Sequence, residues 1–289
     1  MKRLFLILVA VVIFCSTASA QGGEMIVDSL RYRGNTYTYH LYRPKNLPED
    51  APLVVMFHGY GSRSKPERYG LNTVADRHGF AICYPRGPKD FKGKSCWDVG
   101  YEFHRERGWK RDDVGFVGRL VRSLQKEYGF SRKSVFATGH SNGGEMCYLL
   151  AYLRPELFAA VAPVSGLTME WMYRDLSAKR PVPLFEIHGT NDKTSLWEGD
   201  PTNQGGWGAY LSVPRAVGYW CAVNRCTHEV REELPVLRNK VIAHKYIGGT
   251  EGKEVWLYEI VDGGHSWADR DLDVGEHIWR FFSKYIATK

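Results

Sequence analysis

The serine at position 141 lies between glycines in the stretch ATGHSNGG, residues 137–144. Residues 134–137, just before it, favour a buried strand, and apolar residues at helical spacing follow it. A Gly-x-Ser-x-Gly pattern between a strand and a helix is typical of a nucleophile elbow, a sharp turn that exposes a serine hydroxyl above a sheet. Glycines are expected there because the backbone approaches neighbouring elements too closely for a side chain. We therefore predict Ser141 to be a nucleophile.

A serine hydroxyl becomes a good nucleophile only when a base takes its proton and an acid orients that base. Asp192 follows the apolar run over residues 184–187, at a strand end of the kind where sites form in open α/β sheets. His265 follows the last predicted strand, and two glycines before it leave its loop free to bring the imidazole to Ser141. The chain order serine, acid, histidine is the order expected with such an elbow. We predict Ser141, Asp192 and His265 to form a catalytic triad.

Other acids and histidines near the predicted strand ends are weaker alternatives. Asp200 lies deeper in a loop, and Asp262 is too near His265 in sequence to be the usual partner. Three further histidines lie in tight turns and are expected to support the loops through hydrogen bonds: His58, His140 and His188.

Acyl transfer also needs hydrogen-bond donors for the oxyanion that forms in the transition state. The backbone N–H of Asn142, directly after the nucleophile, is one predicted donor. The second is expected in the turn HGYG that follows the apolar run over residues 53–57. We predict the N–H of Tyr60 for this role, with Gly61 as the second choice.

The elements that must position these residues alternate along the chain. Short apolar runs predict strands at residues 53–57, 80–84, 135–138, 159–164, 184–187 and 255–260. Helical spacing is found near residues 69–78, after 112, after 142 and from about 274 to 285. A β-hairpin is expected around Gly34. This alternation predicts the α/β class, with a mostly parallel sheet covered by helices on both faces, in one catalytic domain over residues 21–289.

Residues 1–20 have the pattern of a secretory signal peptide, with two basic residues, an apolar run over 4–15 and small residues at 18–20. The apolar run is too short to span a bilayer. We expect it to be cleaved, which predicts a secreted or periplasmic protein with no stable membrane insertion. Phe14 before Cys15 argues against a lipoprotein.

Charge and cysteine content bear on nucleic-acid binding, disulfides and metal binding. The formal net charge of +7 is spread along the chain without a basic cluster or a nucleic-acid motif, so no nucleic-acid partner is expected. Export permits disulfides, and Cys221 and Cys226 are close enough in sequence to bridge across a turn, while Cys96 could also pair. Cys83 and Cys147 are expected to be buried thiols. No cysteine or histidine spacing suggests a metal site, and the predicted chemistry needs no cofactor.

Several segments together, VVMFHGYG, DDVGFVGRLV, FATGHSNGGEMCYLLAY, PLFEIHGTND and GGHSW, resemble one esterase family. This family groups polyhydroxybutyrate depolymerases with feruloyl esterases and acetylxylan esterases. The resemblance extends from Arg31 to Tyr285. It implies an α/β-hydrolase fold, the triad named above and the HGYG turn as the oxyanion loop, with Asp112 and Asp113 as a structural helix start.

The resemblance implies a secreted serine carboxylic-ester hydrolase, and a feruloyl-type esterase acting on plant cell-wall xylan is the leading hypothesis. An acetylxylan esterase, a polyhydroxybutyrate-type depolymerase, a peptidase or acyltransferase, and an inactive carbohydrate-binding protein are the alternatives. The ester substrate is expected to be polysaccharide-linked or small and soluble. Trp267 matches a family aromatic expected to line the pocket, and Trp97 and Trp197 would suit a phenolic ring or a sugar face.

Overall fold

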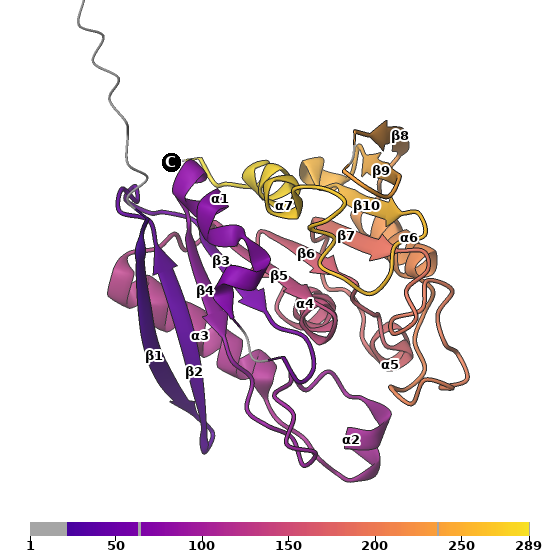
Figure 1. The fold of residues 1–289 in the computed structure, drawn as a ribbon, viewed down its shortest axis with the longest axis horizontal. Helices are drawn as coiled ribbons and strands as arrows, with labels where there is room; N and C mark the ends of the chain where they lie inside the picture. The colour runs from indigo at the N-terminus through magenta and orange to yellow at the C-terminus, as the bar shows by residue number, and fades with distance from the viewer. Residues whose placement is uncertain (1–21, 63–64, 236, 289) are drawn as a thin grey trace, which may run out of the picture.

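The computed structural model describes residues 22–62, 65–235 and 237–288, so the predicted signal peptide lies outside the described residues. Within them, ten strands form one sheet in the order β1-β2-β4-β3-β5-β6-β7-β10-β9-β8 (Figure 1). Six neighbouring strands in this order, from β4 through β3, β5, β6 and β7 to β10, pair in parallel. Antiparallel pairs flank them on both sides. The strands are β1 Glu24–Tyr32, β2 Asn35–Arg43, β3 Leu53–Phe57, β4 Ala81–Pro85, β5 Val135–His140, β6 Ala160–Val164, β7 Leu184–Gly189, β8 His228–Leu234, β9 Val241–Ile247 and β10 Val255–Ile260.

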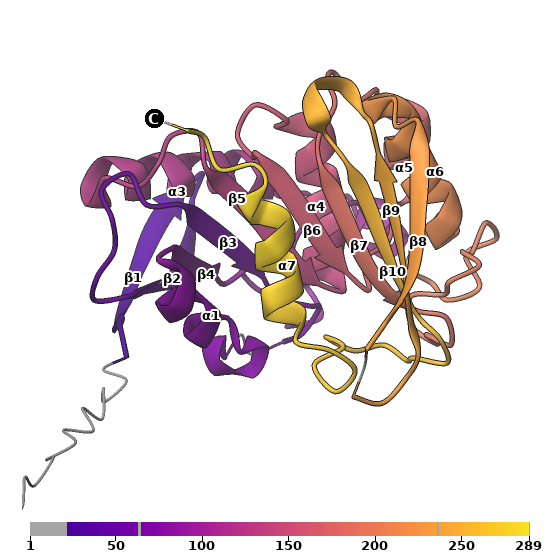
Figure 2. The ribbon, with the colours of Figure 1, turned by 90° about the horizontal axis from the view of Figure 1, so that it is seen from above.

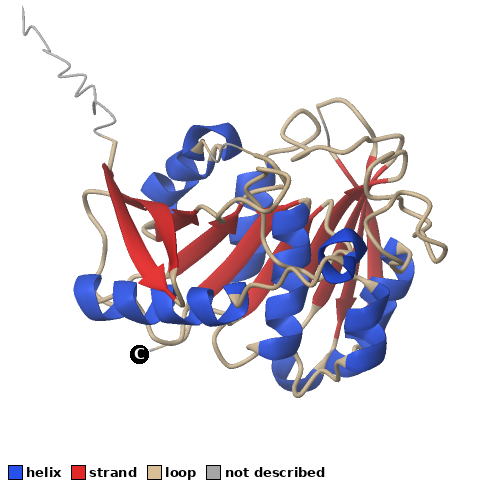
Figure 3. Ribbon diagram, turned by 90° about the horizontal axis from the view of Figure 1, so that it is seen from below, coloured by secondary structure: helices blue, strands red, loops and turns tan. Residues whose placement is uncertain are grey.

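Helices cover both faces of this sheet (Figures 2 and 3). Helices α1 and α7 pack on one face, and α3, α4 and α6 pack on the other. The predicted α/β class, with a mostly parallel sheet between two helical layers, is confirmed. The helices are η1 Pro66–Tyr69, α1 Leu71–His78, α2 Glu102–Glu106, α3 Asp113–Tyr128, α4 Asn142–Leu153, α5 Glu170–Asp175, α6 Val213–Asn224, η2 Thr250–Gly252 and α7 Val274–Ser283.

The apolar runs form strands because both of their faces are buried. In β3, Leu53, Val55 and Phe57 belong to the core beneath α3, α4 and α6. Val54 and Met56 belong to the core beneath α1 and α7. Successive side chains of a strand point to opposite faces, so a central strand between two helical layers must be apolar at every position.

The predicted hairpin is present at the edge of the sheet. Strands β1 and β2 pair antiparallel from Tyr32 opposite Asn35, which leaves a two-residue loop. Both loop residues, Arg33 and Gly34, have positive φ values of 46° and 79°. A two-residue loop with two positive φ values matches the right-handed twist of the strands it connects.

Some elements differ from the expectation. The helix expected over residues 69–78 is divided at Gly70, whose φ of 66° ends η1 and precedes α1. Helix α6 and the strand pair β8 and β9 were not expected. Among the described residues, no helix is long and apolar enough to cross a membrane.

Candidate active site

The turn between β5 and α4 holds Ser141 in a strained conformation. Its φ and ψ are 56° and −121°, a backbone conformation that residues other than glycine rarely adopt. The neighbouring glycines explain how the turn fits. A Cβ atom on Gly139 would lie 2.4 Å from the carbonyl oxygen of Gly143, and one on Gly143 would lie 2.1 Å from the carbonyl oxygen of Phe57. The strand, turn and helix therefore have the close packing that a nucleophile elbow requires.

Asp192 and His265 follow the ends of β7 and β10, which are neighbouring parallel strands. The His265 Nδ1 lies 2.7 Å from the Asp192 Oδ2. A carboxylate only accepts, so Nδ1 carries the hydrogen and Nε2 is left as the basic nitrogen. The other oxygen of Asp192 accepts from the backbone N–H groups of Thr194 and Ser195, at 2.8 Å each.

The carboxyl group of Asp192 is fully buried. Burial acts to raise the pKa of Asp192, but the hydrogen bond and charge of His265 and the charge of His188 outweigh it, so this pKa lies below its ordinary value. Asp192 is therefore ionised at neutral pH and can hold the His265 imidazole in one orientation.

The His265 ring reaches the nucleophile turn. Its centroid is 4.9 Å from that of His140, the residue before Ser141. The backbone next to His265 is fixed as well, because the Ser165 hydroxyl donates to the carbonyl oxygen of Ser266 at 3.2 Å. Among the described residues, no hydrogen bond of the Ser141 hydroxyl is recorded. Catalytic hydrogen bonds are often long in unliganded enzymes, so the missing contact does not argue against His265 as the base for Ser141.

The predicted oxyanion donors also lie at this edge. Asn142 is the first residue of α4, and a helix N-terminus has free N–H groups and a partial positive charge. The structure records no acceptor among the described residues for the N–H groups of Tyr60 and Asn142. The N–H of Gly61 donates to Ser95 at 2.8 Å, so the second choice is already engaged.

Trp97 has a different role from the one expected. Its side chain is completely buried, which contradicts its predicted place on the substrate-binding surface. Its indole N–H donates to the carbonyl oxygen of His58 at 3.0 Å. Its backbone N–H donates to the Asn142 Oδ1 at 2.7 Å, and the Asn142 amide donates back to its carbonyl at 3.1 Å. Trp97 thus connects the HGYG turn to the first turn of α4.

Trp267 is also a packing residue, because only 4% of it is exposed and its indole donates to the carbonyl of Tyr69 at 3.2 Å. This corrects the expectation that it lines the pocket. Trp197 is half-buried beside His188, with ring centroids 6.1 Å apart, and its substrate role stays a prediction.

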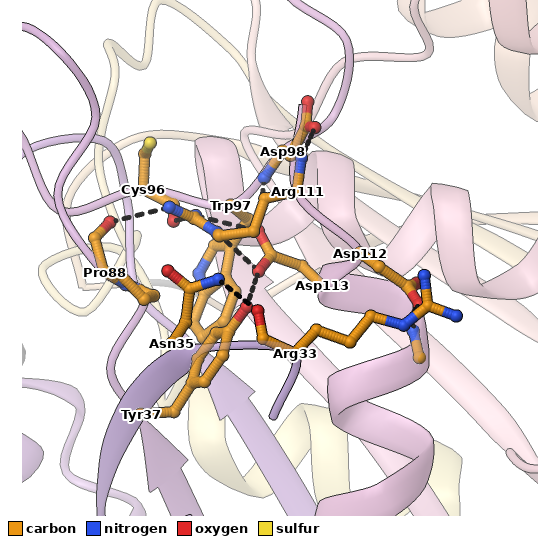
Figure 4. A network of polar contacts seen from close by, with 12 residues as sticks. Arg33, Asn35, Tyr37, Pro88, Cys96, Trp97, Asp98, Arg111, Asp112 and Asp113 are labelled. Carbon is orange, nitrogen blue, oxygen red and sulfur yellow. Dashed lines mark hydrogen bonds and ion pairs between the residues drawn. The ribbon is translucent and has the colours of Figure 1, made fainter. Parts of the chain in front are cut away.

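A buried ion pair anchors the long loop that carries Trp97 (Figure 4). Arg111 donates two hydrogen bonds to the Asp113 carboxylate, at 2.7 and 2.8 Å. The Asp98 N–H and the Tyr37 hydroxyl donate to the same carboxylate, at 2.7 Å each. The structural role expected of Asp113 is thereby confirmed, because a bidentate pair with further donors is among the stronger polar contacts.

Asp112 caps α3, since it accepts from the Gly115 N–H at 2.8 Å. The rival acids are engaged in turns of their own. Asp200 accepts from the N–H groups of two residues in its loop, and Asp262 lies at a positive φ of 58°. Two of the histidines expected to support loops do so. His58 accepts from the Gly87 N–H at 3.0 Å, and the His188 Nε2 lies 2.8 Å from the carbonyl oxygen of Ser195 in the following loop. The His140 Nε2 is buried without a partner among the described residues.

Asp90, Cys96 and His104 form a buried group whose ligand-type atoms lie within 4.8 Å of one another. The sequence spacing did not predict this group. One oxygen of Asp90 accepts from the Tyr60 hydroxyl at 2.7 Å and faces the His104 Nε2 at 3.0 Å, and the other accepts from two backbone N–H groups. Both Asp90 oxygens already have hydrogen-bond partners, and one of these partners is the Tyr60 hydroxyl. We therefore assign this group the structural role of anchoring the Tyr60 side chain.

Glu145 is a further buried acid that the sequence interpretation missed. It lies on α4 four residues after Ser141, and its Oε2 accepts from the Tyr101 hydroxyl and from the Asn142 amide. Burial raises the pKa of Glu145 to about 7. The available signal was one acidic residue within an otherwise apolar helix.

The five cysteines in the described part of the chain are free thiols. Cys221 and Cys226 lie at the end of α6, where the Cys226 N–H donates to the Cys221 carbonyl at 3.0 Å. Both are half-buried, whereas Cys83, Cys96 and Cys147 are buried.

The fold is shared with solved structures. It is similar to an acetyl xylan esterase from Aspergillus awamori, with a TM-score of 0.61 and 19% identity over 89% of this chain and 99% of that chain. It is also similar to an S-formylglutathione hydrolase from Agrobacterium tumefaciens, with a TM-score of 0.61 and 15% identity over 91% of this chain and 96% of that one. With the parallel sheet and the strained serine turn, this likeness defines an α/β-hydrolase fold.

Residues 37–182, just over half of the chain, match the family model described as Esterase PHB depolymerase. The chain belongs to this family, as its resemblance predicted. A bifunctional acetylxylan esterase/xylanase, XynS20E of Neocallimastix patriciarum, is 34% identical over 58% of this chain and 23% of that protein. Feruloyl esterase B of Talaromyces stipitatus is 30% identical over 44% of this chain and 35% of that protein. The aligned region thus spans less than half the length of these relatives.

Proposed function

We propose that this protein is an exported serine carboxylic-ester hydrolase that removes acyl groups from plant cell-wall polysaccharide. The observation that carries the proposal is the 2.7 Å contact between Asp192 and the His265 Nδ1, beside the strained turn that presents Ser141. The arrangement leaves the opposite nitrogen of His265 as the base that the serine needs.

The proposed reaction has two acyl-transfer steps. The His265 Nε2 accepts the proton of Ser141 while the Ser141 Oγ attacks the ester carbonyl carbon. The backbone N–H groups of Tyr60 and Asn142 stabilise the oxyanion, each worth about 3–4 kcal/mol in enzymes of this kind. His265 then gives its proton to the leaving alcohol, and a water molecule, deprotonated by His265, releases the acid. Asp192 orients the imidazole throughout.

A feruloyl-type ester is the leading substrate. Next to the proposed oxyanion donor, the Tyr60 ring makes edge contacts with Tyr101, Phe103 and Trp207, with centroids 5.6 to 6.1 Å apart. Phe103 and Trp207 are half-buried and leave aromatic surface beside the turn. Such surface favours a phenolic ring or a sugar face. The acetyl alternative is supported by the relatives named as acetylxylan esterases.

Replacement of the nucleophile tests the activity. Ser141→Ala should lower hydrolysis of p-nitrophenyl acetate by at least about 10⁴-fold without loss of folding. Ser283→Ala, a change at an exposed serine of α7, is the matched control and should retain activity. Undiminished turnover in a pure Ser141→Ala preparation would refute the triad.

The substrate class is tested by parallel release assays on feruloylated arabinoxylan, acetylated xylan and short hydroxybutyrate oligomers. We expect feruloylated arabinoxylan to give the highest kcat/KM. A preference for acetylated xylan or for the oligomers would move the assignment to an acetylxylan esterase or to a depolymerase.

Export is supported by the basic and apolar pattern of residues 1–20. N-terminal sequencing of the protein recovered outside the cytoplasm should begin at Gln21. A protein that keeps residues 1–20 after expression in its host would contradict cleavage.

A further inference from the structure

A second histidine lies behind Asp192. His188 and Glu186 are two residues apart on β7, and side chains at that spacing point to the same face of a strand. Both side chains are fully buried. The His188 Nδ1 is 2.8 Å from the Glu186 Oε1, and its Nε2 is 2.8 Å from the Ser195 carbonyl oxygen. Each ring nitrogen therefore faces an oxygen.

The chemistry of these two oxygens fixes the hydrogens on the ring. A carbonyl oxygen only accepts, so the His188 Nε2 carries a hydrogen and donates it to Ser195. An ionised carboxylate also only accepts, so the contact between Nδ1 and Glu186 needs a hydrogen of its own. A neutral imidazole has a single N–H hydrogen, which Nε2 already holds. The pair must contain one further proton, on His188 or on Glu186.

The surroundings of Glu186 favour the proton on His188. Glu186 accepts from the Tyr148 hydroxyl at 3.0 Å and from the Gly166 N–H at 3.3 Å, and His188 is its third donor. Several donors around a carboxylate stabilise its ionised form. Burial acts to lower the pKa of His188, but the hydrogen bond and charge of Glu186 outweigh it and raise this pKa above its ordinary value. Burial outweighs the donors around Glu186 and raises its pKa as well, so Glu186 is the competing site for this proton.

We propose that His188 is a positioning residue, an imidazolium paired with Glu186 that keeps the Asp192 carboxylate ionised and directed at His265. This inference rests on the triad proposed above. The His188 Nε2 lies 3.6 Å from the Asp192 Oδ2, the same oxygen that accepts from His265. An opposite charge at this distance favours the ionised carboxylate. The other Asp192 oxygen is held by two backbone N–H groups, so donors and the cation surround the carboxylate.

Nitrogen-15 NMR of the histidine rings in the full protein tests the protonation state without substrate. At about pH 8, well above the ordinary histidine pKa, we expect two protonated ring nitrogens for His188 and one for His58. His58 is an internal control, because its Nε2 accepts from the Gly87 N–H and burial lowers its pKa to about 4. Glu186→Gln should remove the imidazolium signal of His188. A neutral His188 ring in the unaltered protein, with Glu186 protonated instead, would overturn the proposal.

The positioning role is tested with His188→Gln. Without the cation, Asp192 becomes a stronger acceptor, so the proton resonance of the His265 Nδ1–H should move downfield. The kcat for ester hydrolysis should fall by about tenfold while KM changes by less than about twofold, because substrate contacts are untouched. A native resonance and a native kcat in a folded variant would overturn the role. If His188→Gln does not fold, the spectrum of the unaltered protein still decides the protonation state. If the unaltered protein hydrolyses no ester, the proposed function fails while the NMR result stands.

Discussion

Glu145 makes the stability of this protein depend on pH in a defined direction. The side chain is 2% exposed, and burial raises its pKa from 4.5 to about 7. The unfolded chain therefore releases the proton at lower pH than the folded protein does. The stabilising contribution of this group is fully present below about pH 4.5 and is lost as the pH rises through 7. A rise of this size in the pKa corresponds to about 3 kcal/mol.

Glu145→Gln removes this ionisation and keeps a similar shape, including an oxygen that can accept from Tyr101. We expect the variant to gain about 3 kcal/mol of stability relative to the unaltered protein between about pH 4.5 and pH 7.5. Urea unfolding at several pH values measures the difference, in which the other titrating groups cancel. Glu106→Gln, at an exposed position of α2, is the control and should show no such trend. A stability difference for Glu145→Gln that does not change with pH would refute the reasoning.

Three further outcomes follow from particular contacts. Gly143→Ala should unfold the protein or displace α4, because its Cβ would lie 2.1 Å from the Phe57 carbonyl oxygen. The control is Gly218→Ala on α6, whose Cβ meets nothing within 4 Å, and it should raise the free energy of unfolding in urea by about 0.5–1 kcal/mol. Equal effects of the two changes would contradict this account. Tyr60→Phe removes the hydroxyl that donates a hydrogen bond to Asp90, and it should lower kcat by about tenfold with little change in KM. An unaltered kcat would show that this anchor is dispensable. A thiol reagent should label the half-buried Cys221 and Cys226 in the folded protein. Cys147 should react only after unfolding, because it is 0% exposed and the reagent cannot reach it; rapid labelling of Cys147 in the folded state would contradict its burial.

Patterns that arise from burial on two faces could be read from the sequence. The run over residues 53–57 predicted β3 because a strand between two helical layers has no polar position. The elbow was predictable because its glycines are required by contacts within and beside one turn. The contact between Asp192 and His265 followed from the rule that parallel strands end at one edge. Their catalytic roles stay a prediction.

Features that depend on distant partners could not be predicted. Strand β8 has the sequence HEVREEL and is almost entirely exposed at the sheet edge. It therefore has no apolar run from which a strand could be predicted. The burial of Trp97 depends on its contacts with His58 and Asn142, which come from other elements. The interpretation of aromatic loop residues as ligand-binding failed there because composition does not tell a packed ring from an exposed one.

The segments that carry Asp192 and His265 are joined to each other. The Asn191 N–H donates to the Gly263 carbonyl at 2.9 Å, and a Cβ on Gly189 would lie 2.2 Å from the same oxygen. Insertions in either segment would separate Asp192 from His265, so changes in loop length should be tolerated better elsewhere, as in the mostly exposed residues 201–206. Loops around the site could thus change in length while the proposed acid and base keep their positions relative to each other.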